Sequence, residues 1–304
     1  MSTTNPVPDA VPAKDAFGRQ VKVMSPTRQV VRRFTRHRLA MTGLVVFAII
    51  TLMAVFAPLV TRYDPNHIEL LARNQKPSLD HWFGTDRTGR DIYSRVVYAG
   101  RVSIMVGVLA VAISVVIAIL LGSLAGFFGG KVDMIIMRFT DVIMTFPAIV
   151  IFVTVAALAG PGVQNTILVI GLLNWPIPCR LVRAKILSVR ETEFVTAARA
   201  IGAPTRRIIA FHAMPNVVDV IVVYSTLGIA IAILLEAGLS FLGVGVQQPT
   251  SSWGNMLNVA RNISVLESSP WLWIPPGVAI VLTVLAVNLI GDGLRDALDP
   301  RMKT

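Results

Sequence analysis

Charged residues and cysteine are both scarce in this chain of 304 residues. Asp, Glu, Lys and Arg account for 15% of the sequence, compared with about 25% in soluble domains, and hydrophobic residues account for 54%. The one cysteine, Cys179, lies in an apolar stretch, which excludes a disulfide framework and a CxxC metal or redox site. Together with a mean hydropathy of +0.67, this composition predicts an integral membrane protein.

Motifs for catalysis and nucleotide binding are missing as well. The sequence contains no HExxH or GxSxG pattern. The nearest approach to a phosphate-binding P-loop, residues 125–132, has Gly130-Lys131 but carries Ala125 in place of the first glycine and Val132 in place of Ser or Thr. We therefore predict that the chain has no catalytic residue and no metal site, and that it binds no ATP.

Long uncharged stretches dominate the rest of the sequence. Five of them lack Asp, Glu, Lys, Arg and His, and each can cross about 30 Å of hydrocarbon as a helix rising about 1.5 Å per residue. They are residues 39–60, 102–124, 142–160, 162–179 and 268–291. A sixth stretch, 220–235, is shorter and is bounded by Asp219 and Glu236. The predicted fold is all-α, with six transmembrane helices.

Basic residues indicate the orientation. Nineteen of the 28 Lys and Arg residues fall on the side of the N-terminus and eight on the other side. Because positively charged loops stay in the cytoplasm, both termini of this multi-pass protein of the cell membrane are predicted to be cytoplasmic. Such loops and anionic lipid account for the net charge of +11, and no nucleic-acid partner is predicted.

The spans divide the chain into five parts. Residues 1–38 contain four prolines and no apolar run, and we interpret them as a mobile cytoplasmic tail. Residues 39–60 are too long for a cleaved signal core and form the first span. An extracytoplasmic loop, 61–101, precedes a five-helix core, 102–294, and a short cytoplasmic tail, 295–304, ends the chain.

The cytoplasmic connection within the core, residues 180–215, has the pattern of two short helices. Glu193 favours a helix N-terminus, alanines at 197, 198 and 200 propagate the helix, and Gly202 ends it. Pro204 can begin a second helix that ends before Pro215. An exposed alanine face would let another protein approach closely, and the basic side chains can meet acidic groups or lipid; these are Arg199, Arg206 and Arg207.

This connection resembles the signature loop of ABC importer membrane subunits. In that family the pattern is Glu-Ala-Ala, three residues, Gly, nine residues, then Ile-x-Leu-Pro, which Ala197-Ala198, Gly202 and Met214-Pro215 fit. The resemblance implies a type I importer permease fold, with this segment as the coupling helix seated on an ATP-binding subunit. Thr196 and His212 depart from the Glu and Ile positions, and Met214 replaces Leu. Glu193, one turn before Thr196, is an alternative source of the missing acidic contact.

Two further segments resemble the second membrane subunit of dipeptide, oligopeptide and nickel importers. They are residues 82–95, with 100–103, and residues 236–243, with Trp253-Gly254. The resemblance implies four partners: a similar permease subunit, two ATP-binding subunits that hold ATP and Mg, and an extracytoplasmic substrate-binding protein. The transported solute is then a dipeptide, an oligopeptide, nickel or another small solute.

Residues of the first outer loop have two interpretations. One interpretation is a salt-bridged cap over the helices, formed by Asp86, Arg90 and Asp91, and the other is a contact of these residues with the binding protein. Trp253, in the last outer loop, is a candidate for the same region. Gly84 indicates a turn with unusual backbone angles, and so does Gly89.

Four polar residues are candidates for the translocation path. Arg138 and Asp141 lie three apart on one helix face and are expected to pair, rather than to form a gate. Asn174 lies within the fourth span, close to prolines at 147, 176 and 178 that can bend spans three and four. Glu236 can meet the amino terminus of a peptide, although an arginine partner is the more ordinary expectation.

Two rival classes fit less well. A secondary transporter driven by an ion gradient predicts inverted repeats and carboxylates in mid-membrane, whereas here the acids cluster near the span ends and no duplication is evident. An intramembrane enzyme needs paired catalytic groups within a span, and none is found.

Glycines at 122, 126 and 130 recur every four residues and predict a close-packed helix face.

Overall fold

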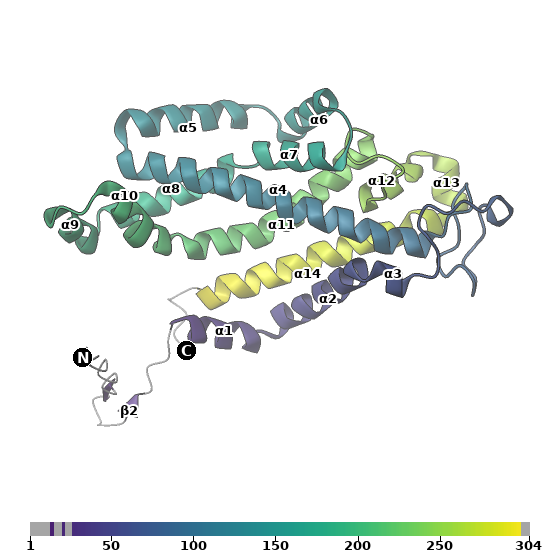
Figure 1. Ribbon diagram of the computed structural model, residues 1–304, viewed down its shortest axis with the longest axis horizontal. Helices are drawn as coiled ribbons and strands as arrows, with labels where there is room; N and C mark the ends of the chain where they lie inside the picture. Colours follow the sequence, from purple (N-terminus) through teal and green to yellow (C-terminus); the bar gives the residue numbers. More distant parts are fainter. Residues whose placement is uncertain (1–12, 15–19, 22–25, 299–304) are drawn as a thin grey trace, which may run out of the picture.

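The computed structural model describes residues 13–14, 20–21 and 26–298, and this part of the chain is almost entirely helical. Two short strands, β1 (Ala13–Lys14) and β2 (Gln20–Val21), pair antiparallel ahead of the helices. The long helices run roughly along one axis of the molecule (Figure 1). The predicted all-α membrane fold is confirmed.

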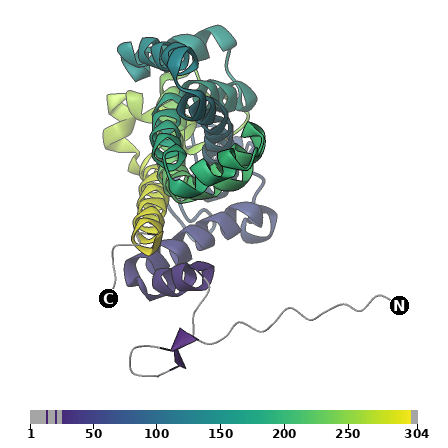
Figure 2. The ribbon, with the colours of Figure 1, turned by 90° about the vertical axis from the view of Figure 1, so that its left-hand side faces the viewer.

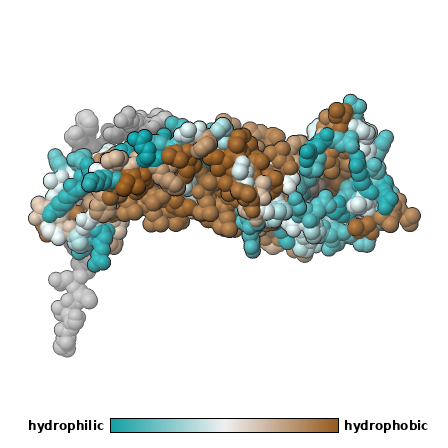
Figure 3. Space-filling model, turned by 90° about the horizontal axis from the view of Figure 1, so that it is seen from above, coloured by the Kyte–Doolittle hydropathy of each residue, from teal (hydrophilic) through white to brown (hydrophobic). Residues whose placement is uncertain are grey.

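Five helical units are long and apolar enough to cross a membrane. They are α2 (Arg38–Val55), α4 (Ile92–Phe128), α7 (Val163–Leu173) with α8 (Pro176–Arg190), α11 (Val218–Leu242) and α14 (Ile274–Leu298). A sixth crossing exists if α5 (Gly130–Thr145) and α6 (Ala148–Ala159), which are bent by 89° at the break between them, count as one span. Figure 3 shows the resulting apolar band between two hydrophilic ends.

Short elements make up those two ends. The end that the sequence predicts to be extracytoplasmic contains α3 (Ala57–Val60), η1 (Leu70–Ala72), α12 (Trp253–Leu257), η4 (Asn258–Arg261), α13 (Ile263–Ser268) and η5 (Pro270–Leu272). The other end contains α9 (Glu193–Ala200), α10 (Thr205–Ile208), the π-helical turn η2 (Ile209–Ala213) and the 3-10 turn η3 (Met214–Asn216). Figure 1 shows α9 and α10 far from α12 and α13.

Several span boundaries differ from the expectation. The stretch 142–160 is not one straight helix, because Pro147 disfavours helical geometry at Phe146, whose ψ is 147°. The second span begins ten residues earlier than expected, at Ile92, where Asp91 caps it. The fifth span extends beyond 235, since Glu236 is buried among protein groups and does not end the helix.

Part of the predicted N-terminal tail is a helix. Helix α1 (Pro26–Arg36) packs against α14, where a Cβ built on Gly293 would lie 3.4 Å from the Phe34 ring. The apolar residues Val30, Val31 and Phe34 recur at helical spacing among arginines, which is the pattern of an amphipathic helix and contains no uncharged run. The expectation of a mobile tail is wrong for this segment, and residues 1–12, 15–19 and 22–25 lie outside the described part.

Helix α4 lies at the centre of the bundle. It contacts α7, α8 and α11, while α14 packs between α11 and α2 on the far side (Figure 2). Glycines permit the closest approach, since a Cβ on Gly122 would lie 2.7 Å from the Cys179 carbonyl and one on Gly126 would lie 2.8 Å from that of Arg183. Gly130 does not belong to this face, because it begins α5 with a φ of +52° and a Cβ built on it would meet nothing within 4 Å.

Candidate functional site

The α8–α11 connection (residues 191–217) turns at a left-handed glycine. Gly202 has a φ of +77°; its amide donates to Arg199 at 3.0 Å, and the Ala203 amide donates to Ala198 at 3.0 Å. Together these two bonds make a Schellman motif, after which Pro204 caps α10. The predicted helix, bend and second helix are confirmed. The second helix differs in extent, since η3 carries it through Pro215.

One side of the connection is part of the protein core. Val195 and Ala198 of α9 are buried, and they belong to a cluster with Ile186 of α8 and Phe127 of α4. Ala198 is therefore not on the exposed alanine face that the sequence predicted. The helical period explains this, because Val195 and Ala198 are three residues apart and share the face that α8 covers.

The other side of the connection is exposed and mixes small, basic and apolar groups. Thr196 and Ala197 are exposed, and the Thr196 hydroxyl donates to the carbonyl of Thr192 at 3.2 Å. Arg199 lies over the Phe127 ring, 5.2 Å from its centroid. In the described part of the chain, the remaining charged residues of this face form no ion pair; they are Glu193, Arg206 and Arg207.

Large apolar side chains on this face were missed by the sequence analysis. Ile201 is 85% exposed and Phe211 is 74% exposed, and Phe194 is also exposed. Their position among charged residues in a short amphipathic segment was the available signal. Pro215 is exposed as well, while the side chain of His212 lies outside the described residues.

Ion pairs hold α8, which leads into the connection, to the helices on either side of it. On α5, Asp141 accepts a hydrogen bond from Arg180 at 2.5 Å, and Asp133 forms a two-bond pair with Arg183. On α11, Asp219 accepts from Lys185 at 3.1 Å. The expected pair of Arg138 with Asp141 is wrong, because Asp141 turns toward α8 and Arg138 remains exposed.

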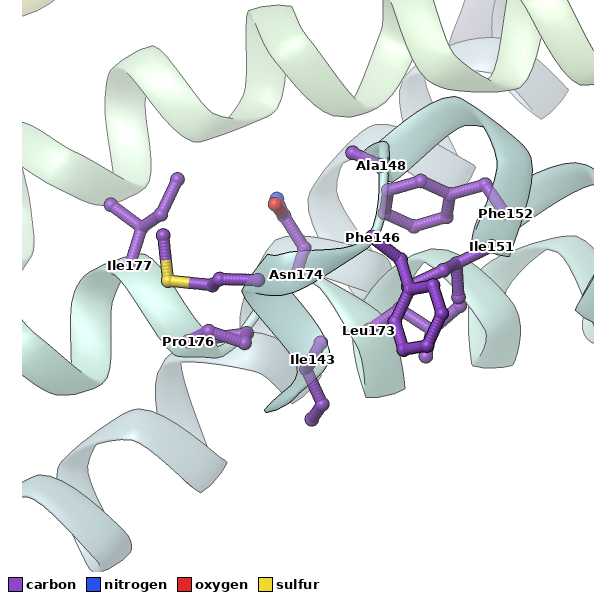
Figure 4. A pocket seen from close by; sticks show the side chains of 10 residues that line it. Ile143, Phe146, Ala148, Ile151, Phe152, Leu173, Asn174, Pro176 and Ile177 are labelled. Atoms are coloured by element: carbon purple, nitrogen blue, oxygen red, sulfur yellow. The ribbon is translucent and has the colours of Figure 1, made fainter. Parts of the chain in front are cut away.

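An apolar pocket lies where two spans are interrupted. One interruption is the bend at Phe146 and Pro147, and the other is at Asn174 and Trp175 between α7 and α8. The pocket has a volume of about 220 Å³ and is lined by residues from the ends of all four helices. Figure 4 shows the amide of Asn174 projecting between Ile177 and Phe152. Bends at Pro147 and Pro176 were predicted, but their convergence on one pocket was not.

Glu236 is enclosed by this chain's own helices. It is fully buried and accepts hydrogen bonds from Ser103 at 2.9 Å and from Ser240 at 2.7 Å. Ser103 also accepts from the backbone amide of Trp253 at 3.2 Å, so the carboxylate joins α4, α11 and α12. The expected arginine partner is absent among the described residues, and Glu236 faces no open path.

Residues 61–91 form a cap that is built around two positive-φ glycines and Asp86. We call it the outer cap because the sequence predicts it to be extracytoplasmic. Gly84 and Gly89 have φ values of +72° and +84°, which confirms the expected turns. The Asp86 carboxylate accepts from the Thr88 hydroxyl at 2.7 Å and from the Arg90 guanidinium at 2.7 Å. Burial alone would raise the pKa of Asp86, but these bonds and the backbone amides of Thr88 and Arg90 outweigh it and lower that pKa from 3.8.

Asp91 and Trp253 are enclosed rather than presented to solvent. Asp91 caps α4 by accepting from the Ser94 amide at 2.7 Å, and its other oxygen lies 2.9 Å from Nδ1 of the buried His81. The indole of Trp253 is buried and donates to the Val96 carbonyl at 2.9 Å. Asp86 pairs with Arg90 as the cap interpretation expects, whereas Asp91 pairs with His81.

Comparison with known protein families identifies two matching regions. Residues 118–304 match the model of the binding-protein-dependent transport system inner membrane component. Residues 25–77 match the N-terminal transmembrane domain of oligopeptide transport permease C. Together these regions include α1, α2, the break between α5 and α6, and the whole α8–α11 connection.

Individual relatives cover nearly the full chain. A provisionally named peptide permease protein of Brucella suis biovar 1 is 48% identical over 91% of this chain and 91% of its own length. The dipeptide transport system permease protein of Alkalihalophilus pseudofirmus is 43% identical over 98% and 96%. The oligopeptide transport system permease protein of Bacillus subtilis is 38% identical over 97% and 96%.

Proposed function

The chain belongs to the family of binding-protein-dependent transport system inner membrane components, the permeases of ABC importers, and from this premise we propose that it carries short peptides across the cell membrane. The names of its relatives support a peptide as the solute, since they are peptide, dipeptide and oligopeptide permeases. In this proposal a second, similar permease subunit completes the path. An extracytoplasmic binding protein delivers the peptide to the outer end.

We further propose that two separate ATP-binding subunits drive the transport and that the α8–α11 connection receives their movement. The observation that supports this most is the exposed face of the connection, where Ile201 and Phe211 lie among arginines with nothing in the described part of the chain covering them. Large exposed apolar groups rimmed by polar residues mark protein contact sites. The ion pairs of Arg180 and Arg183 with α5 would pass a movement of α8 to the interrupted spans.

The orientation follows from the same proposal. With the connection in the cytoplasm, both termini are cytoplasmic, and the outer cap meets the binding protein. The excess of Lys and Arg on that side supports this arrangement. Reporter domains fused after residue 304 and inserted in the cap at Leu79, which is exposed, would be expected to report opposite sides.

The test of the coupling proposal is a bulky substitution on the exposed face of α9. Ala197→Trp is expected to reduce both assembly with the ATP-binding subunits and ATP-driven peptide uptake in proteoliposomes. Thr35→Trp, at an exposed position on α1, is the matched control and should leave both unchanged. Normal assembly and uptake with Ala197→Trp would contradict the proposed contact.

A further inference from the structure

The pocket at the two helix breaks has the size of one large side chain. Its volume is about 220 Å³. An apolar cavity of about 150 Å³ binds benzene, whereas pockets that enclose a whole drug-sized ligand measure about 300–1,000 Å³. The space therefore fits a single apolar group and not an entire peptide.

Chemically, the pocket is apolar with one polar exception. In Figure 4, the Asn174 amide projects between Ile177 on one side and a group of apolar side chains on the other, which are Phe146, Ile151, Phe152 and Leu173. Within the described part of the chain, this amide forms no hydrogen bond. A hydrogen bond from a partner to this half-buried amide contributes about 0.5–1.5 kcal/mol net. A peptide group offers both a donor and an acceptor, whereas a lipid acyl chain offers neither.

Its place in the span also distinguishes this pocket. Interrupted helices at membrane depth are tolerated where they are buried in protein or line a cavity. Toward the α8–α11 connection, α5 and α8 are joined by the ion pair of Asp141 with Arg180. Asp141 lies two residues before the lining residue Ile143, and Arg180 lies three residues after Ile177. On the side of the connection, the pocket is therefore followed by a charged contact between α5 and α8. Helix α8 is the one that leads into the connection.

We propose that this pocket is a subsite for one apolar side chain of the transported peptide, with the Asn174 amide bonding to the peptide backbone. This inference rests on the proposed peptide transport and adds a preference exerted by the permease itself. The binding protein selects the peptide first, and the pocket then favours peptides with a bulky apolar residue during passage.

The test fills the pocket and compares two peptides. Ala148 is exposed and lines the pocket, so the larger side chain of Ala148→Phe is expected to occupy the space. Ala157→Phe places the same group on the exposed side of the same helix, away from the pocket, and serves as the control. ATP-driven uptake of Ala-Phe-Ala and of tri-alanine is measured in proteoliposomes that contain the complete importer and its binding protein. The preference of the binding protein cancels when the ratio of the two rates in a variant is divided by the same ratio in the wild type.

Ala148→Phe is expected to lower the uptake ratio of Ala-Phe-Ala to tri-alanine about tenfold, because one large group in an apolar pocket discriminates to that degree. Ala157→Phe should leave the ratio unchanged. An unchanged ratio for Ala148→Phe, or an equal fall for both peptides, would overturn the subsite and assign the pocket to lipid or to a side chain of the other permease subunit.

A second measurement does not depend on the folding of a variant. A tripeptide carrying a benzophenone side chain should photo-crosslink within residues 143–177 of the wild-type complex during turnover. Crosslinks confined to other segments would also overturn the inference. Failure of the wild-type complex to take up either peptide would instead contradict the proposed peptide transport, and the subsite with it.

Discussion

The outer cap and the α8–α11 connection both turn on a glycine with positive φ, but their surroundings are opposite. In the cap, a Cβ on Gly89 would lie 1.8 Å from the Glu69 carbonyl, and the nearby Asp86 carboxylate is satisfied within the cap. In the connection, a Cβ on Gly202 would meet nothing within 4 Å.

This difference indicates which end of the molecule is complete by itself. The cap closes on itself, and Arg90 extends it by donating to Gln248 at 3.1 Å. The connection is anchored on one side only and leaves Ile201 and Phe211 uncovered. We therefore expect substitutions in the cap to act on the stability of this chain, and substitutions on the exposed face of the connection to act on its association with the ATP-binding subunits.

The largest expected effect is that of Gly89→Val. A side chain at this position collides with the backbone of Glu69 and also forces a β-branched residue into positive φ, so the free energy of unfolding should fall by about 3–5 kcal/mol. Thermal unfolding in detergent measures the loss. Gly238→Val, at a helical glycine with open space around it, is the control. A loss no larger than that of the control would contradict the enclosed cap.

Asp91→Ala should follow in size. It removes the N-cap of α4 and leaves the buried His81 ring without its partner, which together cost about 2–4 kcal/mol. Asp91→Asn keeps an acceptor for the cap and should cost less. Limited proteolysis of the outer loop, with the melting temperature, distinguishes the two variants. Equal behaviour of both variants and the wild type would show that Asp91 does not organise the cap.

Gly202→Val should have a smaller effect on stability but a clear one on transport. Positive φ costs a residue with a Cβ about 1–2 kcal/mol, and no steric clash adds to it here. The distorted bend should reduce ATP-driven uptake, while Gly202→Asn, which tolerates the left-handed region, should retain most of it. If Gly202→Val transports as well as Gly202→Asn, the shape of the bend does not matter for coupling.

The smallest expected effect is the pH dependence contributed by Asp86. Because its pKa is lowered in the folded protein, its stabilisation is complete above the unfolded value of 3.8 and is lost as pH falls through the lower, folded value. The melting temperature of the wild type should therefore fall more between pH 5 and pH 3 than that of Asp86→Asn. An identical pH dependence in the two proteins would exclude a contribution from this carboxyl group.

Local patterns in the sequence predicted one half of the connection. Gly202 and Pro204 lie in turns whose bonds join residues at most five positions apart, and Glu193 acts on the first turn of its own helix. The helix, the bend and the second helix were therefore predictable. The buried face of α9 was not, because the burial of Ala198 depends on α8 and α4. The exposure of Ile201 and Phe211 was missed for the same reason, since which face of a short helix is covered is decided by its neighbours.

The sequence alone determined the membrane class, the presence of long apolar spans, the basic bias of one side and the Gly-Pro bend, because composition, run length and short-range spacing suffice for them. Only the tertiary structure decided the partners of the polar groups. Glu236 bonds to Ser103, 133 positions away, and Asp141 to Arg180, 39 positions away. The pocket also belongs to this second group, because it exists only where two proline-associated breaks, distant in sequence, meet in space. In a low-dielectric interior each polar group takes the partner that packing brings within reach, and sequence spacing does not record that choice.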